Sequence, residues 1–183
     1  MVRTGYSFRA ALDSDPAASV GVIQMKDLGD AGEVDLASLA RVSVDVRPES
    51  RVRQRDIVVR SRGDRATCAL VAGDPGCAIV AAPLLLVRVV DQRVLPAYLS
   101  WYINQAPTQA HLAKRSEGSN VKMITKRTLL DLEIAVPELD RQRDIVALAS
   151  LWARHRGLES ELERLRSAQL SRVMMRYAEG SEG

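Results

Sequence analysis

The sequence of 183 residues has few of the side chains from which metal and redox sites are built. It contains two cysteines, Cys68 and Cys77, and neither forms a CxxC pair or a Cys/His metal spacing. Because both lie in apolar, strand-like runs, we predict buried free thiols, which suits a reducing cytoplasm. The two histidines, His111 and His155, lie far apart and suggest no catalytic triad. The sequence therefore predicts no metal and no cofactor.

Long apolar runs are also missing. The longest, residues 78–90, is interrupted by Pro83 and Arg88, whereas a membrane helix needs about 20 apolar residues. The first residues, Met1 to Tyr6, lack the apolar centre of a signal peptide. We therefore expect a cytoplasmic protein without a membrane segment.

Positive charge is concentrated in two segments, although the whole chain carries only +3. Residues 47–65 hold seven arginines against three acids, and residues 114–127 hold five bases against one acid. The C-terminal residues 138–183 are neutral, so the remainder of the chain is acidic. Local basicity of this kind favours contact with phosphates, and a solvated, arginine-rich loop is the alternative.

Each basic segment has a feature that suits DNA. The period of two in Arg51, Arg53 and Arg55 would place three guanidinium groups on one face if the segment is extended. Ser119 and Asn120 lie in a loop and can donate to phosphate or base edges. The candidate DNA-binding residues are Arg51, Arg53, Arg55, Arg60, Arg62, Arg65, Lys114, Arg115, Ser119, Asn120, Lys122, Lys126 and Arg127.

The residue sets of the common DNA-modifying enzymes are absent from the sequence. A metal-dependent nuclease uses clustered acids followed by Glu/Asp-x-Lys, but Asn120 and Ile124 stand two residues before Lys122 and Lys126. A methyltransferase needs a glycine-rich cofactor loop and an Asn/Asp-Pro-Pro-Tyr/Phe base pocket, and the sequence has neither motif. We predict a chain without catalytic residues.

The N-terminal part, residues 1–137, has the pattern of an α+β domain with a mixed sheet and short helices. Alternating or apolar runs predict strands at 20–24, 42–46, 56–60, 67–72, 77–82, 84–89 and 133–136. Pro75 and Gly76 predict a hairpin turn between two of them. Helices are expected over 95–104 and from Pro107 to about Lys114. The aromatic residues of the first helix are read as core.

The C-terminal segment, residues 138–183, has the pattern of one long helix that ends near Tyr177. Its apolar positions alternate steps of three and four, which is a coiled-coil seam formed by Leu148, Leu151, His155, Leu158, Leu162 and Leu165. Forty helical residues span about 60 Å. Such a helix needs a partner, because one small domain cannot cover its length.

Three motifs resemble those of the specificity (S) subunit of type I restriction–modification systems. The run Val136-Pro137-x-Leu139-x-x-Gln142-x-x-Ile145, preceded by Gly118-Ser119, is similar to the family's junction between a recognition domain and a spacer helix. Residues 56–63 resemble its Gly-Asp-Ile-Leu-x-x-x-Arg-Gly strand, with Arg55 in place of the glycine. Residues 95–104 resemble its Pro-x-Tyr-Leu-x-x-Tyr-Leu-Asn helix.

The resemblance implies a half-length S subunit with a single target recognition domain. Residues 1–137 would bind double-stranded DNA, and residues 138–183 would serve dimerisation and docking of a DNA methyltransferase subunit. A restriction subunit could join the same complex. Two chains with antiparallel helices would form a homodimer that rebuilds a two-domain subunit with a symmetric target. The alternative is a coiled-coil adaptor or regulator with a basic, nucleic-acid-binding body.

Overall fold

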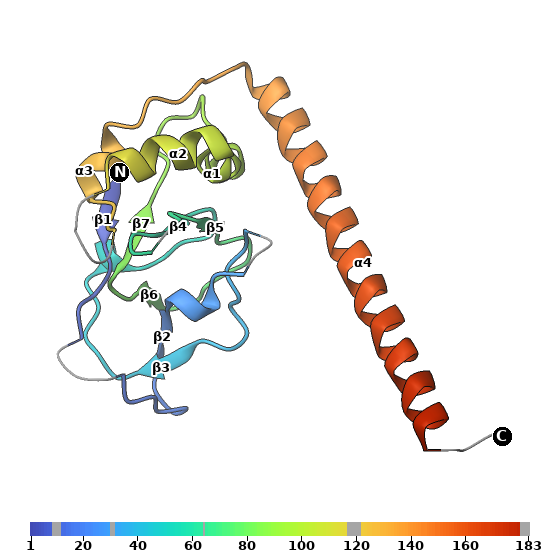
Figure 1. Ribbon diagram of the computed structural model, residues 1–183. Helices are drawn as coiled ribbons and strands as arrows, with labels where there is room; N and C mark the ends of the chain where they lie inside the picture. The colour runs from blue at the N-terminus through green and yellow to red at the C-terminus, as the bar shows by residue number, and fades with distance from the viewer. Residues whose placement is uncertain (9–11, 30–31, 64, 117–121, 180–183) are drawn as a thin grey trace. The chain divides into compact units, whose positions relative to one another are not determined.

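The computed structural model describes residues 1–8, 12–29, 32–63, 65–116 and 122–179 (Figure 1). The chain forms two compact units, Met1–Asp144 and Ile145–Gly183, which we call the body and the arm. The body contains mixed sheets and short helices, and one long helix begins in the body and makes up the arm. This arrangement confirms the predicted α+β class.

The larger sheet of the body has four antiparallel strands in the order β1 (Val2–Thr4), β7 (Leu84–Val87), β4 (Ile57–Arg60) and β5 (Cys68–Leu70). Side chains alternate across it because successive strand residues point to opposite faces. Ile57 and Val59 therefore join one core cluster, and Val58 joins another. Both faces of the sheet are buried, which explains the nearly continuous apolar runs in its strands.

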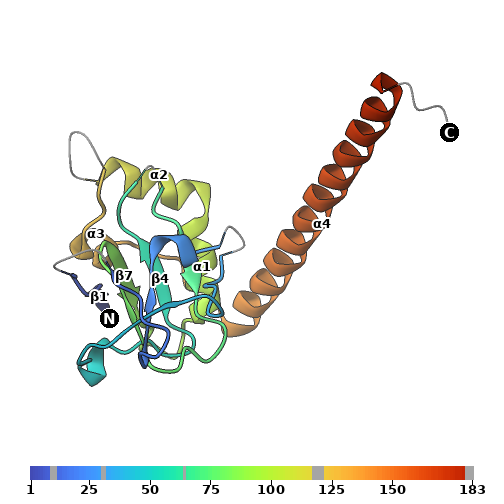
Figure 2. The ribbon, with the colours of Figure 1, turned by 90° about the horizontal axis from the view of Figure 1, so that it is seen from below.

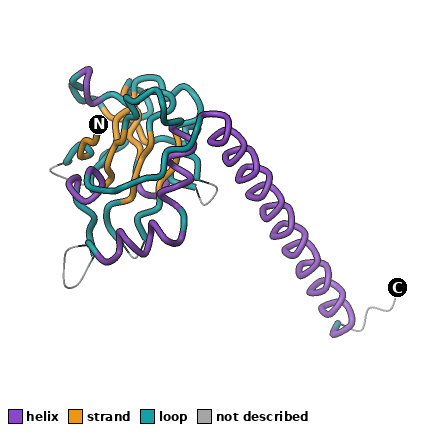
Figure 3. Tube along the Cα trace, turned by 90° about the horizontal axis from the view of Figure 1, so that it is seen from above, coloured by secondary structure: helices purple, strands orange, loops and turns teal. Residues whose placement is uncertain are grey.

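The smaller sheet packs on one face of the larger one. Its order is β3 (Ala40–Val42), β2 (Val20–Ile23) and β6 (Ala78–Val80), with β2 antiparallel to β3 and parallel to β6. The cluster between the sheets includes Ile23, Val58 and Leu86. Two short 3-10 helices, η1 (Met25–Asp27) and η2 (Pro48–Ser50), lie in the connections, and much of the body is loop and turn (Figure 3).

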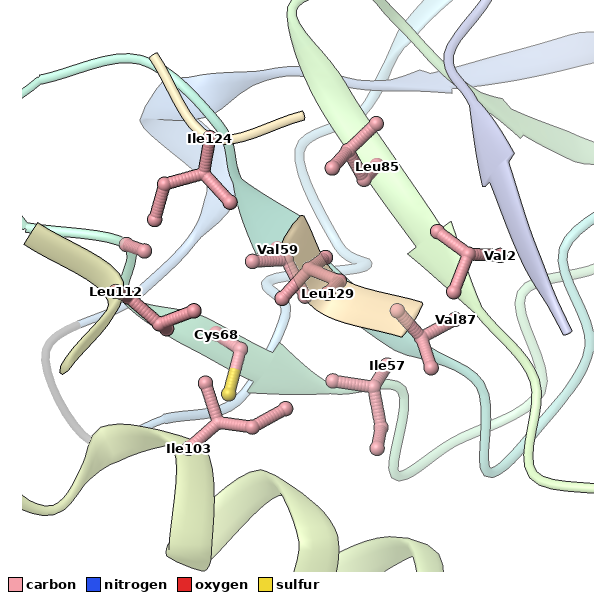
Figure 4. Packing of buried hydrophobic residues seen from close by; sticks show 11 residues of the cluster. Val2, Ile57, Val59, Cys68, Leu85, Val87, Ile103, Leu112, Ile124 and Leu129 are labelled. Atoms are coloured by element: carbon pink, nitrogen blue, oxygen red, sulfur yellow. The ribbon is translucent and has the colours of Figure 1, made fainter. Parts of the chain in front are cut away.

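Three helices cover the other face of the larger sheet: α1 (Pro96–Asn104), α2 (Ala106–Lys114) and α3 (Lys126–Leu130) (Figure 1). Proline in the first turn starts both α1 and α2. α1 packs on β5, and α3 lies beside β1 (Figure 2). Ile103, Leu112 and Leu129 bring the three helices into one cluster with Ile57 and Val59 (Figure 4).

The long helix α4 runs from Leu139 to Ala178, close to its predicted bounds. It continues through Gly157, because a solvent-facing glycine weakens a helix without breaking it. The seam residues are exposed, and Leu148, Leu158 and Leu162 keep 68%, 64% and 48% of their surface accessible. Within the described ranges, no helix combines the length and apolar character needed to cross a membrane.

Some strand predictions are wrong because strand pairing is decided by distant segments. Residues 133–136 form no strand, and Val136 is 45% exposed. The strand expected at 42–46 is placed at 40–42. The turn at Pro75 and Gly76 is present, and Gly76 has the expected positive φ of 58°. It is not a hairpin, however, since β5 and β6 belong to different sheets.

The two thiols differ in burial. Cys68 is buried, as predicted, and its Sγ lies 3.2 Å from the carbonyl oxygen of Ser100. Burial raises the pKa of the Cys68 thiol to about 12. Cys77 is only half-buried, because it precedes β6 at the end of the inter-sheet connection.

Candidate nucleic-acid interface

The two basic segments meet where β4 ends. Arg62 and Met123 form an isolated antiparallel bridge. The Ile124 N–H donates to the Ser61 carbonyl at 2.7 Å, and the Gly63 N–H donates to the Lys122 carbonyl at 3.2 Å. Ser61 and Ile124 are buried, whereas Arg62 and Lys122 are exposed. The pairing therefore fixes the backbone of two basic segments that lie about 60 residues apart in the sequence.

Helix α2 is attached to the same region through one buried side chain. The amide of Gln109 accepts the Ala66 N–H at 3.0 Å and donates to the Ala66 carbonyl at 3.1 Å. This fixes the segment that follows Arg65 against α2, the helix that ends at Lys114 and is followed by Arg115. Arg65, Lys114 and Arg115 are exposed.

Helix α3 carries two further bases. Thr125 caps it, since its hydroxyl accepts the Thr128 N–H at 3.2 Å, and Ile124 and Leu129 anchor the segment in the core (Figure 4). Lys126 and Arg127 in the first turn remain exposed. Arg127 is 3.6 Å from Asp131, and this exposed pair contributes little stability. We call the exposed bases Arg62, Arg65, Lys114, Arg115, Lys122, Lys126 and Arg127 the basic face.

Arg60 differs from the other bases of its segment. It is half-buried, and its Nη2 donates to the Met25 carbonyl at 3.1 Å. Its Nε is buried without a hydrogen-bond partner among the described residues. Arg60 therefore points toward the second sheet and is a poor candidate for contact with a ligand at the surface.

The remaining candidates, Arg51, Arg53 and Arg55, precede β4 and lie at its opposite end. The expected straight row of three is wrong, because residues 53–56 make a turn and Arg55 has a positive φ of 71°. Arg51 and Arg53 still flank the buried Val52, and all three arginines are exposed. Ser119 and Asn120 lie outside the described residues.

Comparison with known proteins gives structural relatives. No protein-family model matches the chain, and no curated protein sequence matches it. One similar solved chain comes from work on the assembly and conformational transition of a type I R-M system, with 17% identity and a TM-score of 0.73. The match covers 94% of this chain and 40% of that one.

Two further solved chains are similar. The HsdS subunit from Thermoanaerobacter tengcongensis has 18% identity and a TM-score of 0.54, over 86% of this chain and 39% of that one. The type I restriction–modification S subunit from M. genitalium has 14% identity and a TM-score of 0.55, over 91% and 40%. The chain has the fold of type I specificity subunits. It spans about two fifths of the length of the solved chains that it matches.

The run from Val136 to Ile145 has a structural role in this chain. Gln142 is fully buried, and its side chain accepts the Leu95 N–H at 2.9 Å. It also donates to the carbonyls of Arg93 and Pro137, both at 2.7 Å. The Tyr98 hydroxyl donates to the Ala135 carbonyl at 2.8 Å. The first turn of α4 is thus fixed to the start of α1 by hydrogen bonds of the Gln142 side-chain amide.

Sequence reasoning missed a second structural group, the ion pair of Asp56 and Arg88. Both side chains are largely buried, with 2% and 14% of their surface exposed. Hydrogen bonding to Asp56 raises the pKa of the Arg88 guanidinium. An arginine inside the otherwise apolar 84–90 run was the available signal, since a charge in a buried strand needs a partner.

No group of three His, Cys, Asp or Glu side chains in the described part of the chain is placed to hold a metal ion. His155 lies on the surface of the arm, with its Nδ1 3.3 Å from a Glu159 oxygen. Its ring is stacked on that of Trp152, with 5.7 Å between the ring centroids. His111 is exposed at the end of α2. The basic face offers positive charge and hydrogen-bond donors for a polyanion.

Proposed function

We propose that this chain is the DNA-targeting specificity component of a type I restriction–modification complex. The observation that carries the proposal is the basic face, in which two distant segments of like charge are joined by backbone hydrogen bonds on a body with this fold. Joining the segments of Arg62 and Lys122 brings like charges close, which opposes folding, and a polyanionic ligand offsets that repulsion. Duplex DNA is such a ligand, and the basic face would follow its phosphates.

The chain itself would not catalyse a reaction. A DNA methyltransferase subunit, and a restriction subunit where the complex cleaves DNA, would supply the chemistry. The purified chain should leave DNA uncut and unmethylated in the presence of Mg²⁺, ATP and S-adenosylmethionine. Methylation should appear when the methyltransferase subunit is added.

The arm would join two copies of the chain through antiparallel helices, on which the methyltransferase subunits dock. In a symmetric antiparallel pair, Leu148 lies opposite Leu165 of the second copy, and Leu151 lies opposite Leu162. Arg154 then comes near Glu161 of the second copy, which is an attractive contact. A parallel pair would instead bring Arg154 near Glu159 of the second copy, which is also attractive, so the orientation of the helices has to be tested by cross-linking.

Cysteine cross-linking distinguishes the two orientations. A Leu151→Cys, Leu162→Cys chain in a Cys77→Ser background should form an interchain disulfide between positions 151 and 162 if the helices are antiparallel. Disulfides between identical positions would support a parallel pair and contradict the antiparallel proposal. Positions 151 and 162 are eleven residues apart on one helix, so they cannot bridge within a chain.

The salt dependence of duplex binding tests the DNA proposal. Each phosphate contact contributes about 0.9 to the slope of log affinity against log salt concentration. Replacing Arg62 and Lys122 by Ala should lower that slope by roughly two. The control is Arg172→Ala with Arg176→Ala, which removes the same charge from the arm and should leave the slope unchanged. Equal slopes for all three proteins would overturn the proposal.

A further inference from the structure

The turn of residues 51–56, at the end of β4 away from the basic face, is held at almost every backbone position. The Val52 N–H donates to the Ala78 carbonyl at 2.9 Å, and the Arg55 N–H donates to the Val71 carbonyl at 2.8 Å. The Asp56 N–H closes the turn on the Arg53 carbonyl at 3.1 Å. The side chain of Val52 is 3% exposed and anchors the turn in the core.

The buried ion pair fixes the same turn from the inside. Arg88 donates from Nε and Nη2 to the two carboxylate oxygens of Asp56, at 2.8 and 2.6 Å. The carboxylate also accepts the Arg53 N–H at 2.8 Å, and the Arg88 guanidinium donates to the Arg51 carbonyl at 2.9 Å. Arg88, the residue that follows β7, is therefore bonded to both ends of the turn, Arg51 and Asp56.

Arg55 occupies a backbone conformation that favours glycine. Its φ of 71° lies in the left-handed region, which is unfavourable for a residue with a long side chain. An arginine at this position gives no visible benefit to the fold, because its side chain is exposed and forms no ion pair within the described residues. The side chains of Arg51 and Arg53 are likewise exposed and form no ion pair within the described residues.

We propose that residues 51–56 form a preorganised phosphate-binding turn, a second contact with the DNA backbone that is separate from the basic face. Arg51, Arg53 and Arg55 bind the phosphates, and Asp56 and Arg88 are positioning residues that hold the turn. The inference rests on the proposed function. A turn that is rigid before binding loses little conformational entropy when its guanidinium groups engage a ligand.

One duplex can reach both contacts. From Arg55 to Arg62 the chain can extend at most roughly 23 Å, at about 3.3 Å per residue. Phosphates of one DNA strand follow each other at about 3.4 Å along the helix axis. Arg55 and Arg62 would therefore engage phosphates at most roughly seven base pairs apart, on one short duplex.

Substitution of Arg55 gives the decisive test. Arg55→Gly removes the charge and relieves the unfavourable φ, so the unfolding midpoint should not fall, while the salt slope of duplex binding should drop by about 0.9. Arg55→Lys keeps the charge and should retain the slope. Adding Arg53→Ala to Arg55→Gly should lower the slope by roughly two in all.

The positioning role is tested with Arg88→Lys, which keeps the charge but loses the two-pronged contact with Asp56 and the bond to Arg51. It should weaken duplex binding several-fold in the normal chain and have little further effect in a chain that lacks all three turn arginines (Arg51→Ala, Arg53→Ala, Arg55→Gly). Equal weakening in both backgrounds would show that Arg88 supports the whole fold and would remove its positioning role.

The outcomes separate this inference from the proposed function. If Arg55→Gly leaves the slope unchanged while Arg62→Ala with Lys122→Ala lowers it, the turn does not bind DNA and the inference is wrong. If Arg55→Gly instead weakens association with the methyltransferase subunit, the turn is a protein contact and the inference is again wrong. If none of these variants changes the slope, the proposed function fails as well.

Discussion

The body and the arm use leucine in opposite ways. In the body, Leu84 and Leu112 are buried to 1% and 0% exposure within clusters that the chain itself supplies. In the arm, Leu148, Leu151 and Leu158 are each more than 60% exposed. The residue type is the same, but the body leucines pack against segments distant in the sequence, whereas the arm leucines lie on a single helix. The body supplies the partners that bury its own leucines, whereas the seam of the arm is left exposed, as is typical of an interaction surface.

The largest effect should come from charging the seam. Leu158→Asp with Leu162→Asp removes four leucines from the interface of a pair, which should cost roughly 6 kcal/mol of association free energy or more. Sedimentation should show a monomer, and circular dichroism should show a folded body. The matched control is Ser160→Asp with Ser167→Asp, which adds the same charges on the far side of the helix. A wild-type chain that remains monomeric at high micromolar concentration would contradict the proposed dimer.

Two glutamines, one in the body and one in the arm, should differ in their contribution to the free energy of unfolding. The buried side chain of Gln142 in the body satisfies one partly buried N–H and two carbonyls, whereas Gln169 in the arm is exposed. Gln142→Ala should lower the free energy of unfolding of the body by about 3 kcal/mol, since each unsatisfied group costs about 1–3 kcal/mol. Gln169→Ala should change it by less than about 0.5 kcal/mol. Urea unfolding followed by the fluorescence of Trp101 in a Trp152→Phe background measures both, and equal effects would contradict the assigned role of Gln142.

The smallest effect concerns Gly157, near the middle of the arm. An added Cβ at this position would meet no atom within 4 Å. Gly157→Ala should therefore stabilise the helix by about 1 kcal/mol without touching the body. The dimer should become tighter by a few-fold, as measured by dilution, and the urea midpoint of the body should stay the same. A weaker dimer would show that the second copy packs closely against Gly157.

The sequence allowed correct prediction at most places where local chemistry decides the structure, although β1 and α3, which Thr125 caps, were not predicted. Most strand runs, α1, α2 and the bounds of α4 follow from side-chain period and from proline positions. It failed where distant segments decide. Residues 133–136 have strand composition, yet they pair with no strand, and the Ala135 carbonyl accepts the Tyr98 hydroxyl instead.

For the candidate site, the sequence identified the basic segments but could not show how they are arranged. Whether Arg60 turns inward and whether Arg62 meets Lys122 depend on the pairing of β4 with its neighbours. The turn at Arg55 depends on the ion pair of Asp56 with Arg88, which are 32 residues apart. No local pattern specifies contacts over such separations.

We propose that the body reads DNA and that the arm presents two bodies in two-fold symmetry. Selection of bound duplexes from a random library by the purified chain tests both parts at once. The account predicts enrichment of one sequence composed of two inverted half-sites, and enrichment of a single half-site by the Leu158→Asp, Leu162→Asp chain. Failure of the wild-type chain to enrich any sequence would contradict the claim.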